Sequence, residues 1–129
     1  MNDPHKLYEL ALEVRHGYLY AFVRGNLAAP DTRITCWAEI ISRCREEKCD
    51  RLLVVQDSPG NSTPTDAFVS SRGITALGLG GIKIAFVDLD PANHENNKFG
   101  ETVAANRGAV AKVFTSESEG LAWLLGAAA

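Results

Sequence analysis

Two polar segments of the chain carry the side chains that could bind or react. One covers residues 57–66 and follows the apolar run 52–56, and the other covers residues 88–97 and follows the apolar run 82–87. Short apolar runs bounded by turn residues are typical of strands buried in a parallel sheet. Because ligands of open α/β sheets bind beyond the carboxyl ends of the strands, both segments are predicted to form one binding edge. The candidate residues for binding a ligand or a partner are Asp57, Ser58, Asn61, Ser62, Thr63, Thr65, Asp88, Asp90 and His94.

The carboxylates in these segments point to an enzyme as the alternative. Asp57, Asp88 and Asp90 could converge at one end of the sheet and hold a hard cation through their oxygens. Asp88 and Asp90, which follow an apolar strand, also resemble the aspartate pair of haloacid-dehalogenase-type phosphatases, with Asp88 as nucleophile and Asp90 as acid or base. The alternative function is therefore a metal-assisted phosphoryl or ester hydrolase.

The rest of a catalytic set does not accompany these carboxylates. The lysines that follow, Lys98 and Lys112, fall on a predicted surface helix and on a predicted strand. Asp90 precedes Pro91, and an acidic residue followed by proline is a typical helix start. His94 has no serine or cysteine nucleophile at a matching spacing. We therefore expect a protein that binds and does not catalyse, with no metal and no cofactor.

The elements that position these segments follow from the hydrophobic pattern. Alternation predicts an edge strand over 7–15, and the apolar stretch 18–23 predicts its hairpin partner. Further along the chain, the pattern predicts helices over 32–48 (with Asp31 as N-cap), 65–77, 90–107 and from Ser116 onward, and strands over 51–56, 82–87 and 109–114. This order, β-β-α-β-α-β-α-β-α, predicts one α/β domain over residues 1–129, with a five-stranded, mostly parallel sheet and right-handed crossovers.

Composition and charge narrow the classes of function. The chain has 129 residues and a net charge of −3, and no basic patch indicates a nucleic-acid partner. No apolar run approaches the ~18 residues of a membrane span, and the first residues lack the order of a signal peptide. We therefore expect a cytoplasmic protein. Cys36, Cys44 and Cys49 lack metal-ligand spacing and are predicted to be buried, reduced thiols.

The C-terminal third of the chain resembles a known family. The segments that carry the resemblance are Phe-Gly-Glu-Thr-Val at 99–103, Asn-Arg-Gly at 106–108 and the ending at 113–124. Together with the element order, they resemble the STAS-like domains, the fold of bacterial anti-sigma-factor antagonists and of the cytoplasmic tails of sulfate transporters. The stand-alone SpoIIAA-like branch, mostly small uncharacterised bacterial proteins, is the most similar. The resemblance implies the STAS-like fold and a regulatory or binding role.

The resemblance also implies candidate phosphoacceptors. In phosphorylatable STAS domains, an Asp-Ser-Ser-Gly-like motif begins the helix after the third strand. The segment 57–60 (Asp-Ser-Pro-Gly) is similar, but it follows its strand directly, and its proline disfavours a helical serine before it. The hydroxyls nearest to the predicted helix start are those of Ser62, Thr63 and Thr65, where a phosphate would gain from free N–H groups and from the helix dipole. Capping and turn formation are the alternative roles of these hydroxyls.

Non-catalytic engagement of a protein partner or a small ligand at 57–66 and 88–97 is therefore the expected function. The sheet face that the helices leave uncovered is expected to expose apolar side chains, which would suit a homodimer or an additional partner.

Overall fold

The computed structural model describes residues 7–59 and 62–126 of the chain. Within these ranges the elements follow one another in the predicted order. The strands are β1 (Tyr8–Arg15), β2 (Tyr18–Gly25), β3 (Arg51–Asp57), β4 (Lys83–Asp88) and β5 (Val110–Phe114). The helices are α1 (Pro30–Glu46), α2 (Pro64–Thr75), α3 (His94–Asn106) and α4 (Glu117–Leu124), and a short 3-10 turn, η1 (Pro91–Asn93), leads into α3.

The five strands form one sheet in the order β1-β2-β3-β4-β5. The hairpin partners β1 and β2 are antiparallel, and each later strand is parallel to its neighbour. The predicted α/β fold with a mixed, mostly parallel sheet is confirmed. Each crossover helix starts shortly after a strand ends, so helix N-termini gather at the carboxyl edge of the parallel strands. We call this edge, where β2, β3 and β4 end at Gly25, Asp57 and Asp88, the rim.

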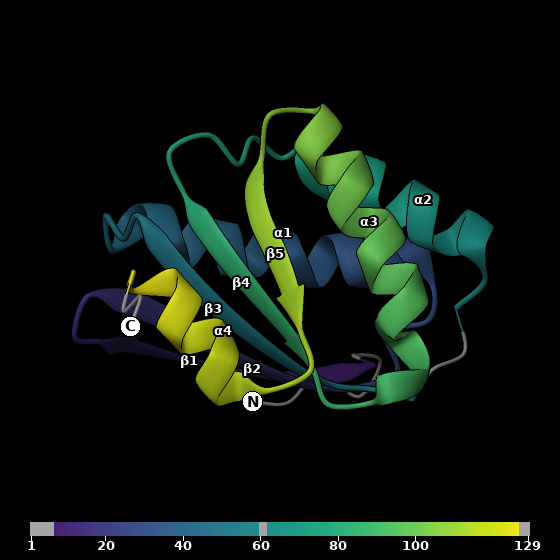
Figure 1. Cartoon of the computed structure of the whole chain (residues 1–129), viewed down its shortest axis with the longest axis horizontal. Helices are drawn as coiled ribbons and strands as arrows, with labels where there is room; N and C mark the ends of the chain where they lie inside the picture. Colours follow the sequence, from purple (N-terminus) through teal and green to yellow (C-terminus); the bar gives the residue numbers. More distant parts are fainter. Residues whose placement is uncertain (1–6, 60–61, 127–129) are drawn as a thin grey trace.

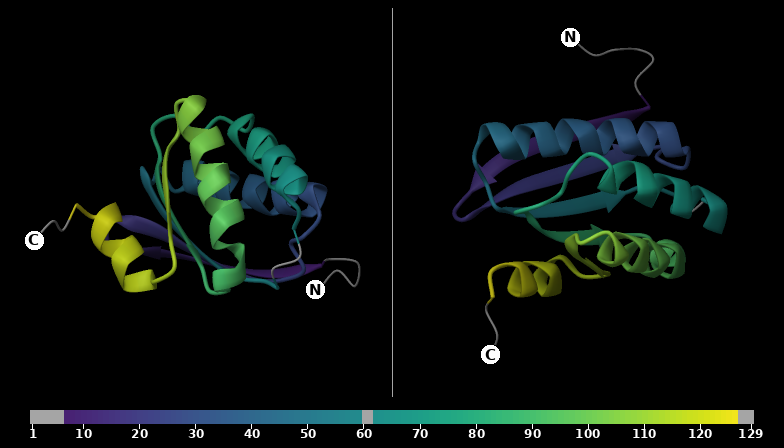
Figure 2. Two further views of the ribbon diagram at one scale, coloured as in Figure 1. Left: turned by 45° about the vertical axis from the view of Figure 1, so that its right-hand side comes forward. Right: turned by 90° about the horizontal axis from the view of Figure 1, so that it is seen from above.

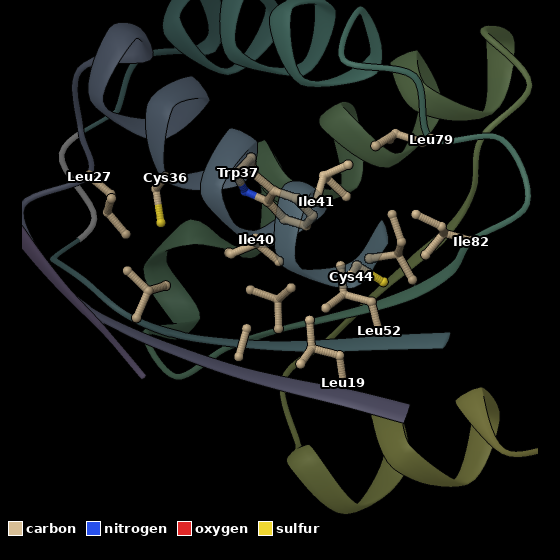
Figure 3. Close-up of a cluster of buried hydrophobic side chains, with 14 of the residues drawn as sticks. Leu19, Leu27, Cys36, Trp37, Ile40, Ile41, Cys44, Leu52, Leu79 and Ile82 are labelled. Atoms are coloured by element: carbon tan, nitrogen blue, oxygen red, sulfur yellow. The ribbon is translucent and has the colours of Figure 1, made fainter. Parts of the chain in front are cut away.

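Helices cover both faces of the sheet. Helices α1, α2 and α3 lie on one face and α4 lies on the other, as Figures 1 and 2 show. The larger buried cluster lies under α1, where Ile40 and Cys44 pack against Leu19 and Leu52 (Figure 3). The smaller cluster lies under α4 and contains the fully buried Leu124. All three cysteines are free thiols, and Cys36 and Cys44 are buried as predicted, whereas Cys49 is only half-buried.

Three helices start at different residues from those predicted: α1, α2 and α3, of which α3 starts at His94, after the 3-10 turn, and not at residue 90. Helix α1 has Pro30 at its first position, and Asp31 lies in the first turn without forming a side-chain cap. Helix α2 starts earlier than predicted, because Thr63 is its N-cap and forms a reciprocal capping box with Asp66. In α1 and α2 proline occupies the first turn, where its missing N–H costs no hydrogen bond. No helix in the described ranges is long and apolar enough to cross a lipid bilayer.

Helix α4 packs on β3, β4 and β5 and leaves the β1–β2 end of that face without a helix. On this surface the rings of Tyr20 and Phe22 are half-buried. The Arg15 guanidinium lies 3.7 Å from the centre of the Tyr20 ring, and that of Arg24 lies 5.5 Å from the Phe22 ring. The expected exposure of apolar side chains is therefore partial on β2, where arginine side chains lie over the half-buried rings. Exposed large apolar side chains of the described residues include the Phe68 and Phe99 pair on α2 and α3.

Candidate functional site

The two predicted polar segments meet at the rim. Strands β3 and β4 are in register at their ends, where Gln56 pairs with Asp88. From the second segment, Nδ2 of Asn96 donates a hydrogen bond to the backbone oxygen of Ser62 in the first, over 2.8 Å. The expected proximity of the two segments is therefore present in their described residues.

Asp57 and Asp88 nevertheless lie on opposite faces of the sheet. Nε2 of Gln56 donates to Oδ2 of Asp88 over 3.3 Å, so these two side chains share the face that α1 to α3 cover. Because side chains alternate along a strand, Asp57 points to the other face, where its Oδ2 lies 3.3 Å from Nε of Arg24. The predicted convergence of Asp57 with Asp88 and Asp90 is wrong. In the described ranges, no group of three or more His, Cys, Asp or Glu side chains could hold a metal ion.

Asp88 is a buried carboxylate with donors on both oxygens. It is 2% exposed. Its Oδ2 accepts hydrogen bonds from Gln56 and from Nδ2 of Asn97 (2.9 Å), and its Oδ1 accepts one from the backbone N–H of Asp90 (3.0 Å). Burial raises the pKa of Asp88, although the hydrogen bonds from Asn97 and Asp90 oppose this rise. The contacts give Asp88 a structural role in closing the turn after β4.

The Asp88→Asn variant tests the burial of this carboxylate through its pH dependence. The folded protein holds the Asp88 proton more tightly than the unfolded chain does, so this residue lowers the free energy of unfolding as pH rises from 3.8 through the raised pKa. Asparagine does not titrate. We expect the free energy of unfolding of the wild type, relative to that of the variant, to fall across this pH window. The fall is about 1.4 kcal/mol for each unit by which the pKa is raised, and the difference is constant at higher pH. Urea titrations across the window measure this difference, and a pH-independent difference would contradict it.

The serines of the first polar segment are bound to the loop that follows β2. Oγ of Ser58, which is buried, accepts from the backbone N–H of Leu27 over 3.2 Å. The hydroxyl of Ser62 donates to the backbone oxygen of Ala28 (3.2 Å) and accepts from the Arg33 guanidinium (3.3 Å). Both serines thus connect the loop after β2 to the loop after β3.

Thr63 and Thr65 lie at the start of α2 and are exposed. Oγ1 of Thr63 accepts from the backbone N–H of Asp66 (3.0 Å), and the Asp66 carboxylate accepts from the backbone N–H of Thr63 (3.3 Å). Thr65 follows in the first turn. Asn61, the remaining candidate of this segment, lies outside the described residues.

Removal of the Thr63 cap is expected to destabilise the protein. The Thr63→Ala change leaves the Asp66 N–H without its side-chain acceptor, and loss of such a cap costs about 1 kcal/mol. Thr65→Ala removes the same atoms from an exposed first-turn position and is expected to change the free energy of unfolding by less than about 0.5 kcal/mol. Chemical denaturation of both variants measures the difference, and equal effects would show that the cap contributes nothing.

The candidates of the second polar segment form the start of α3. Oδ1 of Asp90 accepts from the backbone N–H of Ala92 over 3.0 Å and caps η1, as the helix-start pattern predicts. His94 is the first residue of α3 and is half-buried. Asp90 therefore has a capping role in addition to any role in binding.

A cavity that sequence reasoning missed lies between the sheet and helices α1, α2 and α3. It has a volume of about 90 Å³ and walls that are mostly apolar. The helices contribute Trp37 and Ile74 to its wall, and the strands contribute Ile84, Phe86 and Ala111. A cavity of about 150 Å³ that was engineered into another protein binds benzene. The space therefore suits a small molecule or one end of a longer one.

Ser70 of α2 places an unsatisfied hydroxyl on the wall of this cavity. The residue is 2% exposed, and its Oγ has no hydrogen-bond partner among the residues that the structure describes. Buried polar atoms in folded proteins nearly always have partners, since leaving one unpaired costs about 1–3 kcal/mol. The hydroxyl therefore offers a hydrogen bond to an occupant of the cavity.

Arg33 of α1 brings a positive charge to the same cavity. Its Nε donates to the backbone oxygen of Leu27 (3.2 Å), and a terminal nitrogen donates to Ser62 Oγ (3.3 Å). Burial lowers the pKa of Arg33, and the more distant carboxylates of Asp88 and Asp66 oppose this effect. The guanidinium has no ion pair with any described residue. On the sequence, Arg33 belongs to the polar side of its helix and gave no signal of a site.

Comparison of the chain with protein-family models finds no match, and comparison with curated proteins finds none either. The geometry of the rim and of the cavity is therefore the basis for assigning a function.

Proposed function

We propose that this protein is a non-catalytic, STAS-like binding domain of the SpoIIAA-like type, and that its ligand is a small molecule held in the cavity under α1, α2 and α3. The element order and the mixed sheet support this proposal, as do the C-terminal segments that resemble the family. The two polar segments lie at the rim, next to the polar end of the cavity. Asn96 and Asn97 of the second segment line the cavity themselves.

The observation that carries the proposal is the unpaired hydroxyl of Ser70 in a mostly apolar cavity. Ligand sites combine apolar walls with a few polar groups that fix the orientation of the ligand. Besides Ser70, the cavity has such groups in Arg33 and in the amides of Asn96 and Asn97. The carboxylates of the alternative hydrolase do not form a catalytic group. Asp57 lies on the opposite face of the sheet from Asp88, and Asp88 accepts hydrogen bonds from three donors.

Regulation at the rim is the second part of this proposal. Thr63 and Thr65 are exposed at the N-terminus of α2, where the helix dipole would favour a phosphate. The same helix carries Ser70 into the cavity wall. Phosphorylation or a protein partner at this end of α2 would therefore act next to the bound ligand.

Fluorescence of Trp37 tests ligand binding directly, because this side chain lines the cavity. The Trp123→Phe background removes the other tryptophan of the chain, which lies on α4. Titration with 1-hexanol and with hexanoate is expected to change the Trp37 emission in a saturable way and to raise the melting temperature.

A cavity-filling variant provides the control for this titration. Ala67→Leu adds carbon atoms to a buried residue of the cavity wall and is expected to abolish the response, whereas Ala76→Leu makes the same change at an exposed residue outside the cavity. Circular dichroism checks that both variants fold. The proposal fails if neither probe alters the emission, or if Ala67→Leu responds like the wild type.

A further inference from the structure

The cavity has a polar end and an apolar end. Crossover helices start near the carboxyl ends of the strands, so Arg33, Asn96 and Asn97, which lie early in α1 and α3, mark the end next to the rim. Leu79 precedes β4, and Ile84 and Ala111 lie in the first half of β4 and β5, so these residues mark the opposite end. An occupant that satisfies both ends is polar at one end and apolar at the other.

The polar end carries a positive charge that the described residues do not neutralise by contact. The hydrogen-bond acceptors of the Arg33 guanidinium are a backbone carbonyl and a hydroxyl, both uncharged. A desolvated charge is costly unless an opposite charge is near it. An anion at this end would form charge-assisted, two-pronged hydrogen bonds with the planar guanidinium.

Two acidic groups, Glu101 in the cavity wall and Asp88 at the rim, are already engaged. Both oxygens of Asp88 accept hydrogen bonds from neighbouring N–H groups. Glu101 accepts from the backbone N–H of Val113 over 2.9 Å and lies 3.6 Å from the ammonium group of Lys98. Nδ2 of Asn96 and of Asn97 each uses one N–H group in the contacts described above and has a second to offer. The polar end therefore presents mainly donors.

We propose that the ligand is a small amphiphilic anion, with its carboxylate or phosphate group at Arg33 and its short apolar chain directed toward Leu79 and Ala111. This inference rests on the proposed function and adds the class and the orientation of the ligand. The volume of about 90 Å³ limits the buried part of the chain to a few carbon atoms.

The test compares probes that share one chain and differ in the head group. Hexanoate, hexyl phosphate, 1-hexanol and hexylammonium are titrated against the protein in the Trp123→Phe background. At least one of the two anions is expected to bind more tightly than 1-hexanol, by about 10-fold or more, and hexylammonium is expected to bind more weakly. The stronger anion identifies the head group as carboxylate or phosphate.

Arg33→Gln and Arg45→Gln form a matched pair for this test. Both arginines are on α1 and donate to backbone carbonyls of loops, but Arg45 binds Gly78 and Gly80 and does not line the cavity. Arg33→Gln is expected to remove the preference for anions, by about 10- to 100-fold, while 1-hexanol affinity changes by less than about 2-fold. Arg45→Gln is expected to preserve both affinities.

The outcomes separate this inference from the proposed function. If 1-hexanol binds and neither anion binds more tightly, the cavity is a ligand site and the anion assignment is wrong. If no probe binds, the proposed function itself fails. This comparison uses no substitution at Arg33, so it stands even if Arg33→Gln does not fold.

A variant at the apolar end tests the orientation. Ala111→Leu adds volume at the end opposite Arg33 and is expected to shift the preference from hexanoate toward butanoate, with the preference for anions retained. An unchanged chain-length preference would overturn the proposed orientation.

Discussion

Gly25→Ala is expected to destabilise the protein by about 3–5 kcal/mol, a large effect for the addition of a single methyl group. Gly25 ends β2 with a φ of +139°, a conformation that residues with a Cβ rarely adopt. A Cβ at this position would contact the backbone oxygen of Leu7 and would lie 2.7 Å from Cα of Tyr8. Both are backbone atoms of the neighbouring chain segment, so no side-chain rotation relieves the clash.

Gly108→Ala is the matched control for Gly25→Ala. Gly108 also has a positive φ, +83°, but an added Cβ would meet no atom within 4 Å. Its replacement therefore costs only the conformational strain of about 1–2 kcal/mol. Urea denaturation of both variants measures the difference, and equal losses of stability would show that the clash at Gly25 is relieved by movement of β1.

The position of Gly25 connects this prediction to the site. Tyr8 pairs with Gly25 in the β1–β2 register, so displacing the backbone here moves the edge strand relative to β2. Two residues later, the backbone N–H of Leu27 donates to Ser58, and the oxygen of Leu27 accepts from Arg33. We therefore expect any folded fraction of Gly25→Ala to bind anionic probes less tightly than Gly108→Ala does.

The sheet and its rim were predictable because their signals are local in sequence. Apolar runs that end in Asp57 and Asp88 fix two parallel strands, and turn residues fix where they end. The register of β3 against β4, in contrast, has no local signal in the sequence. It pairs Gln56 with Asp88, and this one-residue offset places Asp57 on the opposite face. Sequence reasoning therefore predicted which residues share the rim but did not predict which of them share a face of the sheet.

The cavity was not predictable from the same signals. Arg33, Ser70 and Asn97 come from three helices that are far apart in the chain, and on each helix they are consistent with a polar, solvent-facing side. Their common environment arises only when α1, α2 and α3 pack on one face of the sheet (Figure 2). Asn96 and Asn97 lay inside the predicted segment 88–97, whereas no periodicity or motif distinguished Arg33 or Ser70.

Ser70→Ala is expected to stabilise the free protein by about 1–2 kcal/mol relative to Ser71→Ala. Both serines lie inside α2, so both variants gain the same intrinsic helix propensity, and the comparison removes that contribution. They differ in burial, since Ser70 is 2% exposed with an unpaired Oγ, whereas Ser71 is only half-buried. Removing the Ser70 hydroxyl removes the cost of burying it without a partner.

The same substitution is expected to weaken ligand binding, by about 1 kcal/mol or roughly 5-fold for the best anionic probe. The Ser70 hydroxyl would then destabilise the free protein and stabilise the complex with ligand. Because selection for stability alone would favour alanine here, such a hydroxyl indicates a residue retained for binding. Thermal denaturation with and without hexanoate measures both effects on one sample. If Ser70→Ala and Ser71→Ala shift the melting temperature equally, the Ser70 hydroxyl is satisfied in the free protein, for example by water in the cavity, and it does not indicate a ligand at this position.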